Sequence, residues 1–475
     1  MDRPTPLRSP DAALPPRPPD DPMTPLNTRN RRLVLVEFFW TRDKDPRIPL
    51  GHASLLTAVR ERGRVEVRSL PIAVNSDEGE ASAVTTRILR ETAGLPHHTV
   101  DIAFGAYVWG ETLLRDVLRR LRDAGFAGRV ILGGPQISYH GGGLESLYPE
   151  ADVFIRGYGE EALATLVESA QSRSIPGVHH AGEVDLVLQA AVELESLPSP
   201  WLTGTIPLGN QAFIRWETQR GCPFRCAFCQ HREPGAQFRR RLLGLPRILK
   251  EVDLFCESGV RDIAVLDPIF NLAPHATEVL ERFVERGYTG RLSLQCRAEG
   301  TRDDFLDAAA RLNTRLEYGL QTIHRAEMVA IRRPNNMPQV DDTLARVRAR
   351  GLQHEVSLIF GLPHQTLASF EQSIAWCLER QVPVLKAFPL MLLRGTALER
   401  DRDRWNIVAG GGPMAYAIAS DSFTPEDWAA MARLSEALRV TEGRHPHTIE
   451  ELRSLARTLE PDLLRFVPHR DVRAA

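Results

Sequence analysis

The chain has 475 residues, of which 43% are hydrophobic and 25% charged, and its formal net charge is −2. This composition is ordinary for a globular protein, and the near-neutral charge gives no electrostatic reason to expect a nucleic-acid partner. No apolar run is long enough to span a bilayer, and the N-terminus is rich in Pro and Asp rather than basic and then apolar, as a signal peptide is.

Residues 1–30 are dense in proline and show no apolar periodicity, which predicts a disordered or extended leader. From residue 31 to 170, buried apolar strands alternate with helices. The predicted strands are LVLVEFF (33–39), VEVRSL (65–70), VDIAFGAYVW (100–109), GRVILGGP (128–135) and ADVFIRG (151–157). This alternation predicts an open, doubly wound, Rossmann-like α/β domain, which binds ligands at the carboxyl ends of its strands. Those ends carry Tyr107, Trp109, Gly133, Gly134, Gly157 and Gly159.

Residues 171–211 lack a strong period, and their Pro and Ser content is typical of an interdomain linker. Trp201 and Leu202 should pack rather than stay in water. Directly after the next predicted strand comes RGCPFRCAFCQH, which spaces Cys222, Cys226 and Cys229 as C-x-x-x-C-x-x-C.

Thiolates at such spacings bind zinc or iron–sulfur clusters. A structural zinc site needs four ligands, and His231 is a candidate fourth, whereas a cluster site can stop at three. Cys256, Cys296 and Cys377 are scattered and are expected to be small buried residues. Six cysteines in a chain of this length do not indicate a disulfide framework, so we expect a reducing, cytoplasmic location.

Residues 212–400 repeat the β/α pattern six times. The predicted strands lie at 213–220, 262–267, 291–300, 316–322, 355–363 and 384–393. Six such units fit a partial (β/α)6 barrel, in which the chemistry lies on loops at the carboxyl ends of the strands. The cysteine loop follows the first of these strands.

Residues 401–475 form a separate, mainly helical C-terminal domain. Thr424 and Thr448 each begin a capping box, T-P-E-D and T-I-E-E, which predicts a helix start. We expect these helices to lie over the mouth of the barrel, with Trp405 and Tyr416 as candidate pocket residues.

The cysteine spacing, with the aromatic Phe228 before the third cysteine, resembles the signature of the radical S-adenosylmethionine (radical SAM) enzymes. The resemblance implies that the three thiolates hold a 4Fe–4S cluster whose open iron chelates SAM. It also implies that strand ends of the barrel contact SAM, where an Arg suits the carboxylate, Asp or Gln the hydroxyls or ammonium, and Gly a close backbone approach. The candidate SAM-binding residues are Phe228, Asp267, Arg297, Gln321 and Gly361.

An α/β domain directly before this signature resembles the cobalamin-binding domain of the cobalamin-dependent radical SAM class. The segments FGAYVW, ILGGPQISYH and IRGYGEEAL carry the resemblance, and the strand-end residues named above are then the candidate cobalamin contacts. The D-x-H-x-x-G cobalamin motif is absent, which implies base-off cobalamin without a His ligand from that motif. The alternative is a degenerate domain that keeps the fold and binds no ligand.

The resemblance implies a cobalamin-dependent radical SAM methyltransferase that acts on an unactivated carbon or phosphorus of a small-molecule or peptide natural product. A reductant such as flavodoxin or ferredoxin would supply electrons. Two alternatives remain open: a radical cyclisation or rearrangement without methyl transfer, and a zinc-binding scaffold without catalysis. Methylthiotransfer to RNA is less favoured, because no basic tail and no second cysteine triplet accompany the barrel.

Overall fold

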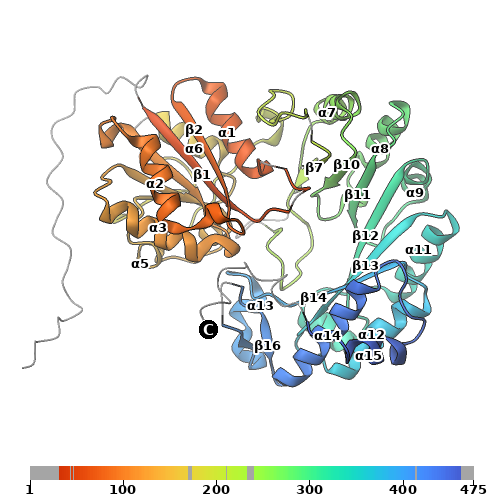
Figure 1. The fold of residues 1–475 in the computed structure, drawn as a ribbon. Coiled ribbons are helices and arrows are strands. Elements are labelled where there is room, and N and C mark those ends of the chain that lie inside the picture. The colour runs from red at the N-terminus through yellow and green to blue at the C-terminus, as the bar shows by residue number, and fades with distance from the viewer. Residues whose placement is uncertain are drawn as a thin grey trace, which may run out of the picture.

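The computed structural model describes residues 31–461, except 43, 47, 169–173, 210, 233–239 and 412–413. The predicted leader at 1–30 lies outside the described residues. Figure 1 shows two α/β halves beside each other, with the N-terminal half in red to yellow and a curved sheet with outer helices in green to blue. Within the described ranges, no helix has the length and apolar character needed to cross a membrane.

The N-terminal half is built on a six-stranded sheet in the order β2-β1-β3-β4-β5-β6. Its first five strands run parallel and β6 is antiparallel to β5. The strands are β1 (Arg32–Phe39), β2 (Glu66–Ala73), β3 (Val100–Gly105), β4 (Arg129–Gly133), β5 (Val153–Ile155) and β6 (Val178–His180). The helices are α1 (Leu50–Arg62), α2 (Ala81–Thr92), α3 (Glu111–Asp123), α4 (Pro135–Ser138), α5 (Leu144–Leu147) and α6 (Glu160–Glu168).

Strand β1 shows why this half is doubly wound. Leu33 and Leu35 pack with α1 and α6 on one face of the sheet, whereas Val34 and Val36 pack with α2 and α3 on the other. Because successive side chains of a strand point to opposite faces, the uninterrupted apolar run buries both faces at once. The predicted Rossmann-like architecture is confirmed.

The predicted linker contributes to this half. It contains β6, which pairs with β5 at the edge of the sheet. Trp201 is buried and packs edge-on against Phe255 of the barrel, with ring centroids 5.3 Å apart, whereas Leu202 is 45% exposed. The expected packing therefore holds for Trp201 and not for Leu202.

The second half is a six-stranded parallel sheet in the order β14-β13-β12-β11-β10-β7, with β14 and β7 at its edges. Its strands are β7 (Phe213–Trp216), β10 (Asp262–Val265), β11 (Arg291–Cys296), β12 (Asn313–Gln321), β13 (Gln353–Phe360) and β14 (Val384–Pro389). The helices between them are α7 (Leu245–Ser258), α8 (Ala276–Glu285), α9 (Asp303–Ala310), α10 (Arg325–Ala330), α11 (Met337–Ala349) and α12 (Leu367–Glu379). Each predicted strand corresponds to one strand of this sheet, as expected for a partial (β/α)6 barrel.

After β14 the chain forms α13 (Ala397–Arg400), the β15–β16 hairpin (Val408–Ala409 and Ala417–Ala419), α14 (Pro425–Val440) and α15 (Ile449–Ala456). Thr424 and Thr448 cap the last two helices through the predicted capping boxes. Both helices lie beside α12, and α14 packs against β13 and β14 (Figure 1). The expectation that they cover the barrel mouth is wrong, because Met431 and Leu438 of α14 are buried in the core on the outer side of the sheet.

The N-terminal sheet depends on a buried ion cluster. Asp101 of β3 is 1% exposed, and each of its carboxylate oxygens accepts hydrogen bonds of 2.8 or 2.9 Å from both Arg31 and Arg129. Removing one partner of such a cluster leaves buried charge uncompensated.

We therefore expect Asp101→Asn to lower the free energy of unfolding by about 3 to 5 kcal/mol, since two guanidinium groups lose their counter-ion. Urea denaturation followed by circular dichroism measures the change. The matched control is Asp116→Asn, which removes exposed ion pairs to Arg119 and Arg120 and should cost less than about 1 kcal/mol. Equal losses in the two variants would contradict this assignment.

Candidate active site

The cysteine loop leaves the barrel at the carboxyl end of β7. A short antiparallel ribbon of β8 (Gln219–Arg220) and β9 (Arg241–Leu242) closes its base. Asp267, which follows β10, is fully buried and accepts hydrogen bonds from the backbone amides of Thr218 (2.9 Å) and Gln219 (3.2 Å). It also accepts the Thr218 hydroxyl. The predicted SAM contact Asp267 thus lies beneath the start of the cysteine loop and holds its backbone.

Ala227 fastens the middle of the loop from two sides. Its backbone amide donates to the carbonyl of Ile331 (2.7 Å), and its carbonyl accepts from the amide of Leu398 (2.9 Å). Phe228 packs against the apolar cluster that Ala227 forms with Leu362 and Leu390. The loop that carries the cysteines is therefore bound to segments after β12 and β14 by its own backbone.

The three cysteines are free and partly buried. They are close enough for the charges of Cys222 and Cys226 to act on Cys229, and burial raises the pKa of the Cys229 thiol to about 11. Among the described residues, no three His, Cys, Asp or Glu side chains approach closely enough to hold a single metal ion. A 4Fe–4S cluster spreads its thiolates over separate irons, and the thiols must lose their protons to bind it.

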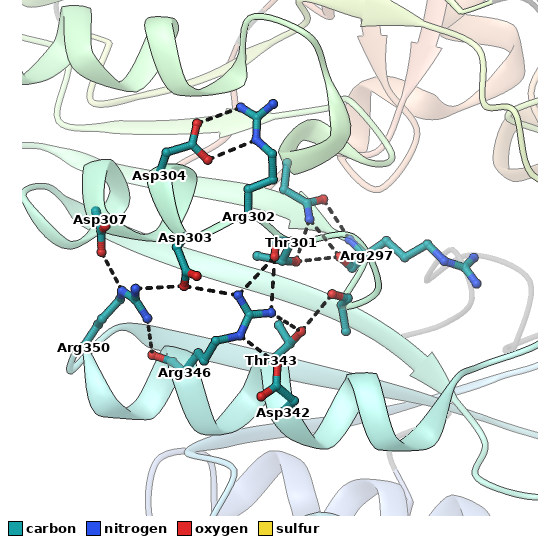
Figure 2. Close-up of polar contacts among 12 residues, drawn as sticks. Arg297, Thr301, Arg302, Asp303, Asp304, Asp307, Asp342, Thr343, Arg346 and Arg350 are labelled. Atoms are coloured by element: carbon teal, nitrogen blue, oxygen red, sulfur yellow. Dashed lines mark hydrogen bonds and ion pairs between the residues drawn. The ribbon is translucent and has the colours of Figure 1, made fainter.

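Arg297, after β11, lies over the cysteine loop. Its guanidinium is 4.0 Å from the ring centroid of Phe224, and its Nη2 donates to the carbonyl of Pro334 (2.8 Å). Asn271 and Thr301 hold the Arg297 backbone through hydrogen bonds of 2.8 to 2.9 Å. Figure 2 shows the guanidinium pointing away from the network of Asp and Arg side chains around α9 and α11. The Arg297 backbone is therefore held on the side of α9 and α11, and its guanidinium faces the cysteine loop.

Strand β12 ends irregularly at the site. Its pairing with β13 shifts register at Gly319 and Gln321, and Gln321 has a left-handed backbone with φ of 69°. Arg333 donates to the Gly319 carbonyl and places Nη1 3.8 Å from the sulfur of Cys226. The bulge and the arginine together bring donors to the side of the cysteine loop.

The turn after β13 is held from below by a buried network. The Gln365 side-chain oxygen accepts from the amides of Gly361 (2.7 Å) and Leu362 (3.1 Å). Glu327 in turn accepts from Thr322 (2.5 Å) and Ser369 (2.6 Å) and lies 3.4 Å from the Gln365 amide nitrogen. This network ties the ends of β12 and β13 together. No sequence pattern predicted this network, because its members come from separate segments.

The cysteine loop also contacts the N-terminal half. Arg220 pairs with Glu160 at the start of α6 (2.6 Å) and with Glu217 (2.7 Å), and all three side chains are largely buried. Tyr139, after α4, donates to the carbonyl of Arg232 (2.7 Å). Arg394, after β14, pairs with Glu111 of α3 (2.9 Å). Charged groups therefore cross the domain interface on both sides of the loop.

A cavity of about 450 Å³ lies between the two halves. The N-terminal half contributes the carboxyl ends of β1, β3, β4 and β5, and the other half contributes both ends of the cysteine loop. Five of the six predicted cobalamin contacts line this cavity, namely Tyr107, Gly133, Gly134, Gly157 and Gly159. Trp109 does not line it. Its indole stacks on Tyr107 and donates to the carbonyl of Phe38 (2.9 Å), and it packs with the opposite face of the sheet.

Gly134 shows how closely the backbone borders this cavity. Its φ of 94° and ψ of −177° belong to a region that only glycine occupies readily. A Cβ there would lie 2.9 Å from the carbonyl oxygen of Ala106. The β4–α4 turn therefore presents bare backbone to whatever occupies the cavity.

The cavity also holds polar groups without partners, which the sequence did not single out. Both amide atoms of Gln219 and the amide oxygen of Gln189 are buried and form no hydrogen bond with the described residues. Beside them, Leu35, Leu55 and Leu163 give the cavity an apolar wall. Unmet hydrogen bonds next to apolar surface suit a ligand that has both polar and apolar parts.

The two candidate substrate-pocket residues lie apart from this cavity. Trp405 is half-buried and stacks edge-on on His364, with centroids 4.7 Å apart. Tyr416 is buried in the barrel core and bridges to Met391. Their role as pocket residues stays a prediction.

Comparison with known proteins agrees with this geometry. The model of the radical SAM superfamily matches residues 216–377, which include the three cysteines. The cobalamin-dependent radical SAM methyltransferase TokK of Streptomyces tokunonensis is 27% identical over 305 residues, or 58% of this chain and 44% of the relative. The 2-(S-pantetheinyl)-carbapenam-3-carboxylate methyltransferase of Streptantibioticus cattleyicolor is 26% identical over 386 residues, or 75% of this chain and 54% of the relative. The chain thus spans about half the length of these relatives.

Two solved structures share the fold. The methyltransferase TsrM from Kitasatospora setae, with tryptophan and a SAM analog bound, has a TM-score of 0.61 at 18% identity over 80% of this chain and 78% of its own. OxsB, with aqua-cobalamin and SAM bound, has a TM-score of 0.63 at 15% identity over 91% of this chain and 71% of its own. At these identities the likeness establishes the architecture. Residues 216–377 therefore match the radical SAM superfamily, and the chain has the two-domain fold of cobalamin-dependent radical SAM enzymes.

Proposed function

We propose that the protein is a cobalamin-dependent radical SAM methyltransferase that acts on an unactivated carbon or phosphorus of a small-molecule or peptide natural product. The two curated relatives are methyltransferases, and one of them is cobalamin-dependent by name. A radical cyclisation or rearrangement without methyl transfer is the competing outcome of the tests below.

One observation carries the proposal. The cavity at the Gly-rich strand ends shares a wall with the cysteine loop, through Arg220, Gly221, Gln230 and His231. A ligand in the N-terminal half would therefore lie against the loop that binds the cluster. A degenerate first domain would have no need of a cavity that opens toward the cysteines.

In this proposal Cys222, Cys226 and Cys229 bind the 4Fe–4S cluster. Around them, Phe228, Arg297, Gln321 and Gly361 would contact SAM, and the Arg297 cation would bind its carboxylate. Asp267 would support the site indirectly, because it accepts hydrogen bonds from the backbone that leads into the cysteine loop.

Cobalamin would occupy the cavity in its base-off form, held by backbone at Gly133, Gly134, Gly157 and Gly159 and by the side chain of Tyr107. When bound, the cluster with SAM supplies one-electron chemistry that can activate an unreactive C–H bond, and cobalamin supplies methyl transfer. The chain itself binds and orients both groups and excludes water between its halves. Electrons would come from flavodoxin or ferredoxin in the cytoplasm.

Replacing any one of Cys222, Cys226 and Cys229 with Ala should abolish the cluster, because one iron then loses its only protein ligand and two thiolates remain to hold the whole cluster. Iron and sulfide analysis after anaerobic reconstitution, with the visible absorption spectrum, measures the loss. The control is Cys256→Ala on α7, outside the loop, which should keep full iron content. Retention of iron by the loop variants, or stoichiometric zinc in the wild type, would refute the assignment.

Gly134→Ala should weaken binding of methylcobalamin about tenfold or more and leave the cluster intact. The left-handed backbone strain of about 1 to 3 kcal/mol must be relieved by moving the turn that borders the cavity. Equilibrium dialysis measures the affinity. Gly141→Ala is the matched control, because a Cβ at Gly141 meets no atom within 4 Å. Equal affinities of the two variants would count against a corrin in this cavity.

Methyl transfer itself is tested with SAM labelled in its methyl group. With the cluster reconstituted, and with cobalamin supplied at a concentration that saturates the wild type but not the Gly134→Ala variant, we expect label to appear in the corrin fraction of the wild type and to be reduced in the variant. Chromatographic separation of SAM and corrin after anaerobic incubation gives the readout. Reductive cleavage of SAM with no labelled corrin would instead favour cyclisation or rearrangement.

A further inference from the structure

Glu37 is a buried acid at the edge of the interdomain cavity. It lies at the carboxyl end of β1, next to Leu35 in the row that faces α1 and α6, and it is 4% exposed. It lines the interdomain cavity, and it forms no hydrogen bond or ion pair with the residues that the structure describes. A buried carboxyl without a partner costs free energy unless it is neutral or bound to a ligand.

The neighbouring strand is shaped around this carboxyl. Glu37 pairs in register with Gly105 of β3, and the carboxylate occupies the space into which a Cβ at residue 105 would project. The same Cβ would lie 2.9 Å from the ring of Tyr107. Gly105 therefore leaves room for both side chains at the rim of the cavity. The acid is therefore accommodated at the edge of the cavity by a glycine of the neighbouring strand.

The charges around Glu37 leave it without a counter-ion. Tyr107 is its nearest titratable neighbour, and the Glu37 charge raises the pKa of that phenol. Across the cavity, Arg220 is already paired with Glu160 of α6 and with Glu217. His231 lines the barrel side, whereas α1 presents only Leu50, Gly51 and Leu55 and β2 places Pro71 opposite Glu37. Burial raises the pKa of Glu37 to about 8, so the neutral acid predominates at neutral pH.

A neutral carboxyl has one donor and one acceptor side by side. A primary carboxamide has the complementary pair, so the two groups can form two reciprocal hydrogen bonds. The corrin ring of cobalamin carries primary carboxamides on its rim. An ionised carboxylate keeps its acceptors and loses the donor, and it would also have to stay desolvated under the ligand.

We propose that Glu37 binds a primary carboxamide of the corrin in its neutral form, and that cobalamin is released more readily when this carboxyl ionises. The inference rests on the proposed occupancy of the cavity by cobalamin. It makes Glu37 a ligand-binding residue of the N-terminal half, with no part in cluster binding.

The test is the affinity for methylcobalamin, measured in the dark by equilibrium dialysis from about pH 6.5 to about pH 9.5, with no reductant and no SAM. Methylcobalamin is the probe because its methyl ligand does not titrate. The neutral form binds, so affinity is expected to be level below the pKa of Glu37 and to fall about tenfold per pH unit above it. Glu37→Gln keeps a donor beside an acceptor, and we expect it to bind at neutral pH within about threefold of the wild type with a level profile.

Glu37→Ala should bind more weakly at every pH, also with a level profile, and all three proteins should keep their iron content. Two results would overturn the inference: the same pH slope in the wild type and in Glu37→Gln, or affinity at neutral pH unchanged in Glu37→Ala. Absence of binding by the wild type at every pH would instead refute cobalamin as the occupant, so failure of the proposed function can be told apart from failure of this inference.

Discussion

The ion pair between Arg220 and Glu160 joins the root of the cysteine loop to the helix that borders the Gly-rich strand ends, at 2.6 Å and largely out of solvent. Breaking a buried pair of this kind costs about 3 to 5 kcal/mol, because the remaining charge stays desolvated. Asp45 with Arg215 (3.1 Å) and Glu111 with Arg394 (2.9 Å) cross the same interface at other points. Directional contacts at three places fix the two halves in one relative position, and the cavity between them has a defined shape as a result.

The cavity is lined by buried polar groups that have no hydrogen-bond partner among the described residues. Each buried polar atom without a partner costs about 1 to 3 kcal/mol, which applies to both amide atoms of Gln219 and to the amide oxygen of Gln189, and burial also raises the pKa of Glu37. Sites retain such groups when a ligand supplies the missing partners. The barrel side is built differently, since Asp267 and Glu327 are engaged in hydrogen bonds with neighbouring segments, and Arg297 and Arg333 direct cations toward the cysteine loop.

The spacing of apolar residues and the positions of turn and capping residues were sufficient to predict most of the fold. The apolar run from Leu33 to Phe39 predicted a strand buried on both faces, and the six β/α units predicted the half-barrel. The C-terminal helices show the limit of such patterns. The capping boxes at Thr424 and Thr448 indicate where each helix begins. They do not indicate which surface of the protein the helix packs against.

The candidate site was predictable where local chemistry is dense, as in the cysteine spacing and the paired glycines Gly133 and Gly134. The sequence did not indicate a role for Glu37, because it is a single polar residue in an apolar run. Its surroundings depend on Gly105, which lies opposite it on a neighbouring strand. The same holds for Glu327 and Gln365, which meet only after the barrel forms. Trp109 was misplaced relative to the cavity because the turn after β3 directs its indole to the opposite face of the sheet.

The central claim is that cluster and corrin lie against each other across one cavity. Electron paramagnetic resonance of the reconstituted protein, with the cluster reduced and the cobalt in its paramagnetic divalent state, tests it most directly. Two unpaired spins held on either side of the cavity should couple, so both signals should be split or broadened relative to those of samples that contain one centre alone. Two unperturbed, independent spectra from a protein that contains both centres would contradict the account.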